Sequence, residues 1–182
     1  MLLIVDNGSV FITEISNAIS KNRTEYTIIP SQTITKSDLS RFDSFVLSGR
    51  RRNDQKMNAI NSEIINHALS ENKPLLGICY GAEILALTLG GTIRKSADII
   101  EGVHSVNVIK QNLLLDKDIE VYQSHSYEIA KLGSQLESVA SSDNCQHEII
   151  KHQRLPIFGT QFHPEMSKDG QLLIESFLKI IH

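Results

Sequence analysis

The stretch that decides the fold is Pro74-Leu-Leu-Gly-Ile-Cys-Tyr-Gly-Ala-Glu-Ile-Leu-Ala-Leu87. Residues 74–78 form a short apolar run typical of a buried strand, and a helix is predicted from Gly81 to Leu89. Between them lies Gly77-Ile-Cys-Tyr-Gly81, the cysteine form of the G-x-S-x-G elbow, in which flanking glycines permit a sharp turn. The turn places Cys79 at the carboxyl end of a strand, beside a helix N-terminus that favours a thiolate. Cys79 is therefore a candidate nucleophile, the alternative being a small buried side chain, the usual fate of a free cysteine.

Strands and helices alternate along the first half of the chain, whereas short strands follow one another in the second half. The predicted strands of the first half are Leu2–Val5, Tyr26–Ile29 and Ser44–Leu47, and helices are predicted from Ser9 to about Asn22 and from Asn58 to Ser70. Those of the second half are Val103–Ile109, Glu120–Tyr122, Leu136–Ser141, His147–Lys151 and Pro156–Gln161, before a last helix at Gln171–Ile181. Alternation implies right-handed crossovers and a parallel sheet. We expect a single three-layer α/β domain over residues 1–182, with a mainly parallel central sheet covered by helices on both faces and a short antiparallel portion in the second half.

Composition excludes several classes of protein. The 182 residues include 18 Lys and Arg against 21 Asp and Glu, which is not the basic footprint of a nucleic-acid-binding protein. Two cysteines cannot make a disulfide framework or a four-cysteine zinc site. The N-terminus turns acidic at Asp6, too early for a signal peptide, and no apolar run approaches the roughly 20 residues that span a bilayer. We expect a cytoplasmic protein without a nucleic-acid or membrane partner.

A cysteine nucleophile needs a base, and Gln161-Phe-His-Pro-Glu165 supplies one. His163 follows an apolar strand, so its side chain emerges at the same sheet edge as the elbow. Glu165 lies two residues later, across a proline, where its carboxylate can accept a hydrogen bond from the imidazole and fix the tautomer. Taken alone, a His-Pro-Glu sequence more often marks a strand end and a turn. Its combination with a cysteine elbow predicts a Cys79–His163–Glu165 catalytic group.

Together these two segments resemble the signatures of class I glutamine amidotransferases, which use a Cys-His-Glu triad. The resemblance extends along most of the chain through Ile4-Val-Asp-Asn-Gly8, Leu47-Ser-Gly49, Gln123-Ser-His125 and Glu148-Ile-Ile-Lys-His152. Within the family the chain is most similar to the separate glutaminase subunits of archaeal GMP synthases. The resemblance implies that Cys79 attacks the side-chain amide of glutamine, forms a γ-glutamyl thioester and releases ammonia, with His163 as the acid and base and Glu165 orienting it.

The resemblance also assigns an oxyanion hole and a substrate pocket, and both depart from the family pattern. The backbone N–H groups of Tyr80, Gly49 and Arg50 are the expected oxyanion donors. Arg50 stands where the family usually has a second glycine of Ser-Gly-Gly-Pro, and its side chain could displace that N–H.

The substrate-binding residues implied by the resemblance are Glu83, Ser124, His125 and Ser126. Glu83 replaces the glutamine of the family's Gly-His-Gln, which removes donors and adds a charge. The segment Ser124-His-Ser-Tyr127 replaces Ser-His-Gly-Asp and so loses an aspartate. The sequence thus predicts an intact triad in an altered pocket.

The remaining chemical groups give weaker signals. The other histidines have no metal-ligand spacing and are interpreted as structural or solvated: His67, His104, His147, His152 and His182. Cys145 lies in a polar turn without a base motif. The basic run Arg50–Arg52 is adjacent to the predicted active edge, where substrate or partner contact competes with a solvated loop.

The chain lacks a phosphate loop and a dinucleotide fingerprint, so no cofactor is expected in it. ATP and Mg²⁺ are expected only on a separate synthetase, most simply one that aminates XMP. Two alternatives remain open from sequence: a stand-alone amidase acting on γ-glutamyl compounds, and a diverged domain that binds or regulates a partner without catalysis.

Overall fold

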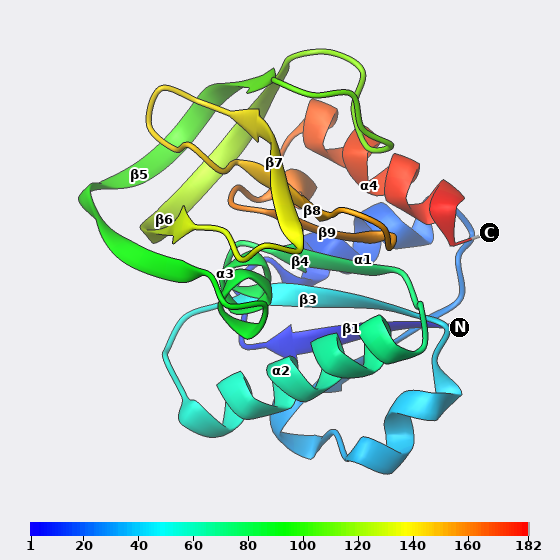
Figure 1. Cartoon of the computed structure of the whole chain (residues 1–182). Helices are drawn as coiled ribbons and strands as arrows, with labels where there is room; N and C mark the ends of the chain where they lie inside the picture. Colours follow the sequence, from blue (N-terminus) through cyan, green and yellow to red (C-terminus); the bar gives the residue numbers. More distant parts are fainter. Residues whose placement is uncertain (182) are drawn as a thin grey trace.

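The computed structural model describes residues 1–181, which fold around one nine-stranded sheet (Figure 1). The strands are β1 (Leu2–Asn7), β2 (Tyr26–Pro30), β3 (Ser44–Arg50), β4 (Leu75–Ile78), β5 (Thr92–Val108), β6 (Ile119–Lys131), β7 (Leu136–Ser141), β8 (Ile149–His152) and β9 (Ile157–Thr160). The α-helices are α1 (Ile12–Ser20), α2 (Gln55–Ser70), α3 (Tyr80–Thr88) and α4 (Lys168–Ile180). Short 3₁₀ turns lie at η1 (Ser31–Thr33), η2 (Lys36–Arg41) and η3 (Pro164–Met166).

The sheet is parallel in its first part and antiparallel in its second. The strand order is β2-β1-β3-β4-β9-β8-β7-β5-β6, and every pairing from β2 to β9 is parallel. From β9 onward the strands pair antiparallel. The predicted α/β class, with parallel strands first and antiparallel strands later, is confirmed. Because β4 and β9 are parallel neighbours, the residues that follow them, including Cys79 and His163, meet at one edge.

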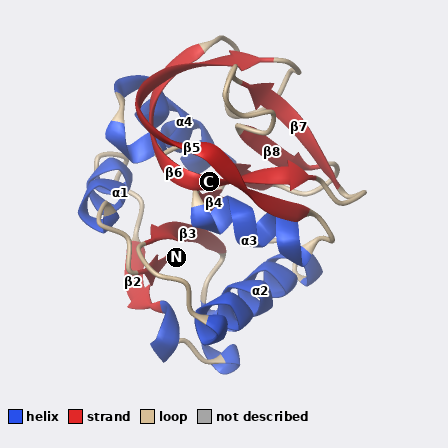
Figure 2. Ribbon diagram, turned by 90° about the vertical axis from the view of Figure 1, so that its left-hand side faces the viewer, coloured by secondary structure: helices blue, strands red, loops and turns tan. Residues whose placement is uncertain are grey.

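Helices cover both faces of the parallel part, and each face has its own apolar core. Leu2 and Ile4 of β1 pack in the core that contains α1 and α4 residues, while Leu3 and Val5 pack in the core of α2 and α3. This division follows from the strand period, since successive side chains point to opposite faces. Figure 2 shows α1 and α4 on one side of the central strands and α2 and α3 on the other. The two buried layers fix β3, β4 and β9 as a rigid base for the site.

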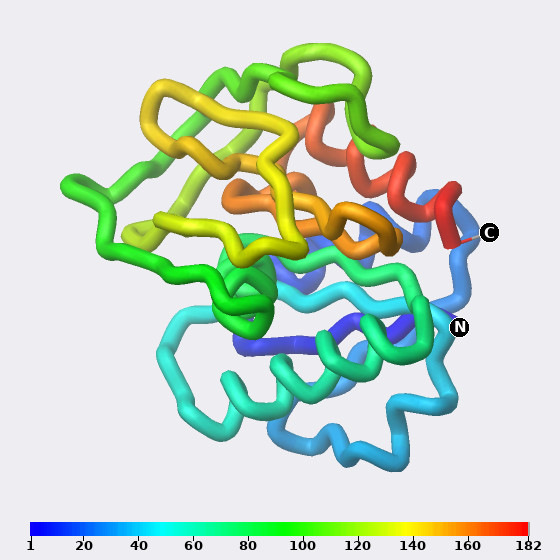
Figure 3. Tube along the Cα trace, in the orientation of Figure 1, coloured from blue at the N-terminus to red at the C-terminus, as the bar shows by residue number. Residues whose placement is uncertain are grey.

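The antiparallel part is larger than the sequence predicts. Strands β5 and β6 span 17 and 13 residues and pair from Thr92↔Lys131 to Val106↔Ile119, forming the long hairpin seen in green and yellow-green in Figure 3. The sequence predicts only Val103–Ile109 and Glu120–Tyr122 there. Much of β5 is exposed and polar, so its sequence lacks the apolar alternation that signals a strand. Among residues 1–181, no helix is long and apolar enough to cross a membrane.

Candidate active site

Cys79 occupies the turn between β4 and α3 in a strained backbone conformation. Its φ of 51° and ψ of −104° lie where a residue with a Cβ is uncommon, at a cost of order 1–3 kcal/mol. Its N–H donates to the carbonyl of Thr160 on β9 at 2.7 Å, which fixes the turn against the neighbouring strand. Tyr80 follows as the first residue of α3, and the first N–H groups of a helix have no intrahelical acceptor. The turn therefore presents the thiol beside free backbone donors.

The two glycines of the elbow are required by the close approach of chain segments. A Cβ on Gly77 would lie 2.5 Å from the carbonyl carbon of Gly81, and a Cβ on Gly81 would overlap the carbonyl oxygen of Leu47 on β3. Both approaches are closer than real Cβ contacts, and the atoms met belong to the backbone. Only glycine at both positions lets α3 start this close to β3 and β4.

His163 and Glu165 form a buried pair immediately after β9. The Nδ1–H of His163 donates to Glu165 Oε1 at 2.8 Å, and the side chains are 5% and 0% exposed. The backbone N–H of His163 donates to the carbonyl of Tyr122 on β6 at 2.9 Å, and the edge-on ring of Phe11 is centred 4.8 Å from the imidazole. The imidazole is thus held on three sides, with its other nitrogen, Nε2, free for a further partner.

That partner is the thiol of Cys79. Burial lowers the pKa of His163, but hydrogen bonds from the imidazole to Cys79 and Glu165 outweigh it and raise the pKa to about 10. A Cβ built on Gly49 of β3 would lie 3.1 Å from His163 Cε1 and 3.8 Å from Cys79 Cβ. Gly49 therefore closes the site from the third strand, against both side chains. Three neighbouring strand ends bring together a thiol, an imidazole and a carboxylate.

Comparison with known proteins agrees with this arrangement. The family model for class I glutamine amidotransferases matches residues 3–180. The chain belongs to the class I glutamine amidotransferase family. The glutamine-hydrolyzing subunit of GMP synthase from Pyrococcus furiosus is 30% identical over 99% of this chain and 98% of that protein. Its counterpart of the same name from Thermoplasma acidophilum is 31% identical over 98% of this chain and 92% of that protein. A solved Thermoplasma acidophilum structure, of a protein provisionally assigned as a GMP synthase subunit, has a TM-score of 0.88 at 29% identity, covering 99% of this chain and 92% of that one.

In this amidotransferase the two departures at Arg50 and Glu83 contact each other. Arg50 is the last residue of β3, with a φ outside the left-handed region, and its guanidinium stacks on the ring of Tyr80 with its carbon 4.2 Å from the ring centroid. Arg50 Nη2 lies 3.9 Å from Glu83 Oε2, and the Nε2–H of Gln161 donates to Glu83 Oε1 at 3.4 Å. Burial raises the pKa of Glu83, while the nearby Arg50 charge opposes that rise. The arginine side chain is therefore directed over α3 toward the altered pocket residue.

The hydroxyl of Tyr80 fixes the same group of side chains from below. It donates to Asn58 Oδ1 of α2 at 2.7 Å, and Arg50 Nη1 donates to Asn58 Oδ1 at 3.4 Å. Burial raises the pKa of the Tyr80 phenol far above its usual range. A neutral, hydrogen-bonded phenol thus supports the guanidinium beside the elbow.

Residues 124–126 lie within β6 rather than in a loop. Ser124 and Ser126 are partly exposed on the strand face that also carries Tyr122, and Tyr122 itself contacts Phe11 with ring centroids 6.0 Å apart. His125 points to the opposite face, where it is buried and both ring nitrogens have partners: Gln123 Oε1 at 2.7 Å and the carbonyl of Tyr127 at 2.8 Å. Of this segment, only the serines share a face with the residues around His163.

The remaining predicted groups lie apart from the triad. Cys145 is buried, and burial raises the pKa of its thiol to about 12, which makes it a poor nucleophile. Within residues 1–181 no group of three or more His, Cys, Asp or Glu side chains could hold a metal ion. His67 contacts Lys73 Nζ at 3.2 Å and His152 contacts Gln135 Oε1 at 3.3 Å. His182 lies outside the described residues.

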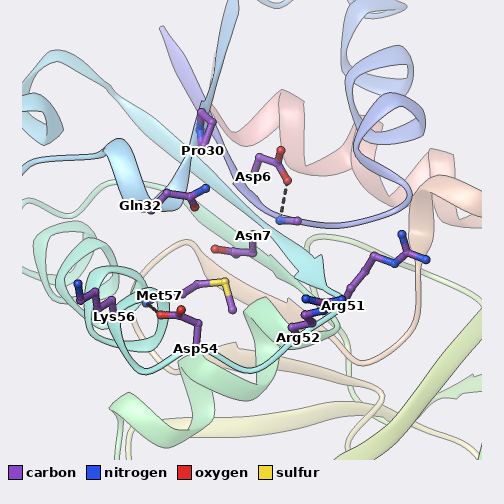
Figure 4. Close-up of a pocket in the computed structure, with 10 residues that line it drawn as sticks. Asp6, Asn7, Pro30, Gln32, Arg51, Arg52, Asp54, Lys56 and Met57 are labelled. Atoms are coloured by element: carbon purple, nitrogen blue, oxygen red, sulfur yellow. Dashed lines mark hydrogen bonds between the residues drawn. The ribbon is translucent and has the colours of Figure 1, made fainter.

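A second concavity adjoins the site at the carboxyl ends of β1, β2 and β3. It has a volume of about 970 Å³, and Figure 4 shows acidic and basic side chains around it. Its carboxylates are engaged locally: Asp6 accepts the N–H of Gly8 at 2.8 Å and Asp54 accepts the N–H of Met57 at 3.0 Å. The cations at its rim are Arg51, Arg52 and Lys56.

Sequence reasoning missed Phe11 and Tyr122 as neighbours of His163. Phe11 precedes α1 and Tyr122 lies in the middle of β6, so neither is near the base in sequence. Neither carries a motif; only the pairing of β6 with the end of β9, through the Tyr122–His163 bridge, brings Tyr122 there. These contacts depend on the fold and leave no local signal.

Proposed function

We propose that this enzyme is the glutamine-hydrolysing component of an amidotransferase built from two chains, and that it delivers ammonia to a separate ATP-dependent synthetase, which aminates XMP to GMP. The observation that carries the proposal is the buried Cys79–His163–Glu165 group at the carboxyl edge of β4 and β9. The similarity to the glutamine-hydrolyzing subunits of archaeal GMP synthases over nearly the whole chain supports the same acceptor. In this proposal no cofactor is held by the chain, and ATP and Mg²⁺ belong to the synthetase.

The proposed reaction begins with attack of the Cys79 thiolate on the carboxamide carbon of glutamine. The oxyanion of the tetrahedral intermediate accepts hydrogen bonds from the backbone N–H groups of Tyr80, Gly49 and Arg50. The His163 imidazolium gives its Nε2 proton to the departing nitrogen, so ammonia leaves and a γ-glutamyl thioester remains. His163 then takes a proton from water, which attacks the thioester and releases glutamate and the thiolate. Glu165 holds the imidazole orientation in both halves of the reaction.

The substrate α-groups are assigned in this proposal to the pocket beside α3 and β6. Glu83 offers a carboxylate for the α-ammonium, and Ser124 and Ser126 offer hydroxyls and backbone groups on the face of Tyr122. His125 contributes through its backbone, because both of its ring nitrogens are engaged elsewhere. The buried Arg50–Glu83 pair favours a substrate that presents a positive group next to Glu83.

The test is a glutaminase assay on the purified chain, alone and with the XMP-aminating synthetase from the same source, ATP, Mg²⁺ and XMP. We expect glutamate release that increases in the presence of the synthetase and its substrates, and no release by Cys79→Ala or His163→Ala. Unchanged activity in either variant contradicts the proposal.

A second candidate, hydrolysis of γ-glutamyl conjugates without a synthetase, is motivated by the altered Arg50–Glu83 pocket. It is distinguished by comparing glutamine with γ-glutamyl amides as substrates in the absence of a partner. A strong preference for the conjugates favours this second function.

A further inference from the structure

A buried polar cluster that the proposed reaction does not use links β6 to the start of β8. Gln123 and Glu148 are 0% exposed and His125 is 7% exposed. One end of the Gln123 amide lies 2.6 Å from Glu148 Oε1, and the other lies 2.7 Å from His125 Nε2. The Nδ1 of His125 lies 2.8 Å from the carbonyl of Tyr127. These side chains form one continuous row inside the protein.

The row has an arithmetic of donors and acceptors that fixes its proton content. A backbone carbonyl only accepts, so Nδ1 of His125 carries a hydrogen. If Nε2 carries one too, it donates to the amide oxygen of Gln123, and the amide nitrogen donates to a Glu148 carboxylate. If Nε2 is bare, it needs the amide nitrogen as donor; the amide oxygen then faces Glu148 at 2.6 Å, which requires a protonated carboxyl. Both arrangements contain one proton beyond a neutral imidazole and a carboxylate.

We propose that Gln123, His125 and Glu148 share one buried proton and that Glu148, by holding it, is a positioning residue for His163. The positioning role rests on the proposed function, whereas the shared proton does not. Removal of the proton leaves either two acceptors or an unpaired buried charge in direct contact, which drives β6 and β8 apart.

Burial decides where the proton lies. It raises the pKa of Glu148, against the opposing hydrogen bonds from Ser142 and Gln123, and it lowers the pKa of His125. Both directions favour the neutral pair, in which the Glu148 hydroxyl donates to the Gln123 oxygen and the Gln123 N–H donates to His125 Nε2. Ser142 supports this arrangement by donating to Glu148 Oε1 at 2.6 Å.

The surrounding charges do not replace this proton. The other titratable groups that face the cluster are His104, Glu128, Cys145 and His163. Glu128 is paired with Arg94 at 2.6 Å, so its charge is compensated locally. Glu148 Oε2 has no hydrogen-bond partner among the described residues, as expected for a carboxyl that is not fully charged.

Two backbone hydrogen bonds connect the cluster to the catalytic base. The N–H of Gln161 donates to the carbonyl of Glu148 at 2.8 Å, and the N–H of His163 donates to the carbonyl of Tyr122, next to Gln123, at 2.9 Å. Gln161 also donates through Nε2 to the carbonyl of Tyr127, which is the acceptor of His125. The segment that ends in His163 is therefore suspended between the two strands that the shared proton holds together.

Glu148→Gln is the decisive variant, because its amide N–H can donate to Gln123 without any titratable proton. We expect infrared difference spectra to contain the carbonyl stretch of a protonated carboxylic acid that is missing in E148Q. The raised pKa of Glu148 makes the folded wild type lose stability as pH rises through that value, so its thermal midpoint should fall more steeply at alkaline pH than that of E148Q. If the acid band is absent and nitrogen shifts of His125 show no imidazolium, or if both proteins have the same pH dependence, the shared proton is wrong.

Positioning is tested by the rate at which iodoacetamide alkylates Cys79, which reports the thiol–imidazole contact whatever the substrate. We expect E148Q to retain the wild-type rate at neutral pH and to keep it further into the alkaline range. Glu148→Ala should lower the alkylation rate about tenfold, in line with a displacement of His163 below 1 Å. Should E148A fail to fold, the pH comparison between wild type and E148Q decides alone. Equal alkylation rates in wild type, E148Q and E148A at every pH overturn the positioning role, and a failure of glutamine hydrolysis alone would affect only the proposed function.

Discussion

Substitution of Gly49 by alanine tests whether β3 controls the position of the catalytic base. The added Cβ would lie 3.1 Å from His163 Cε1, about 0.4 Å inside the shortest ordinary carbon–carbon contact. His163 cannot move freely, because Glu165 holds Nδ1 at 2.8 Å and Tyr122 holds the backbone N–H at 2.9 Å. Since a displacement of 1 Å can cost about 10²-fold in rate, 0.4 Å predicts a loss of kcat of about sixfold. Alanine keeps the backbone N–H, so an oxyanion donor is not removed.

The assay is steady-state glutamine hydrolysis with the folded fraction measured by thermal denaturation. Gly90→Ala is the control: nothing lies within 4 Å of its added Cβ, but its φ of 84° is strained for alanine. We expect Gly90→Ala to lose about 1 kcal/mol of stability with an unchanged kcat, and Gly49→Ala to lose kcat with its fold retained. A wild-type kcat in Gly49→Ala, or equal losses in the two variants, would refute the assigned contact.

Three further perturbations probe charge in the same site. Glu165→Gln keeps the shape but removes the charge that orients His163, so kcat should fall by about 10²- to 10⁴-fold with little change in melting temperature; a change confined to KM would contradict the assigned role. His163 has its pKa raised from 6.5 to about 10, so the folded state keeps a proton that the unfolded state loses, and stability should decline as pH rises across that interval. Chemical denaturation at several pH values should show a flatter decline in Cys79→Ala, which lacks the thiol partner. Arg50→Ala should raise KM for glutamine more than it lowers kcat, at a stability cost of about 1 kcal/mol or less, and the KM effect should shrink in an Arg50→Ala, Glu83→Gln double variant.

The elbow was predictable because its signal is local. Gly77 and Gly81 flank Cys79 at a fixed spacing, and the apolar run before them and the helix after them each show their own period. The segment that ends in Glu165 is equally short-range. Parallel pairing of β4 with β9 then follows from the alternation of strands and helices, and it brings the two segments to one edge.

The long hairpin was not predictable by the same means. Its second strand, β6, buries Gln123, His125 and Glu128, polar residues that favour a loop assignment in a sequence. They lie inside because partners from distant segments satisfy them, such as Arg94 for Glu128 and Glu148 for Gln123. A period computed from apolar residues does not detect a strand whose buried positions are polar and paired.

Arg50 and Glu83 show how the fold changes the meaning of a substitution. In the sequence they are 33 positions apart and represent two separate disturbances, one to the oxyanion hole and one to the substrate pocket. In the structure the guanidinium stacks on Tyr80 and faces the Glu83 carboxylate at 3.9 Å, so each supplies what the other requires. A buried carboxylate without a cation would be driven to its neutral form, and an arginine without that carboxylate would lose a reason to lie along α3. The direction of the Arg50 side chain is what keeps it clear of the Cys79–His163 contact, so the charge at position 83 helps preserve the catalytic geometry at position 50.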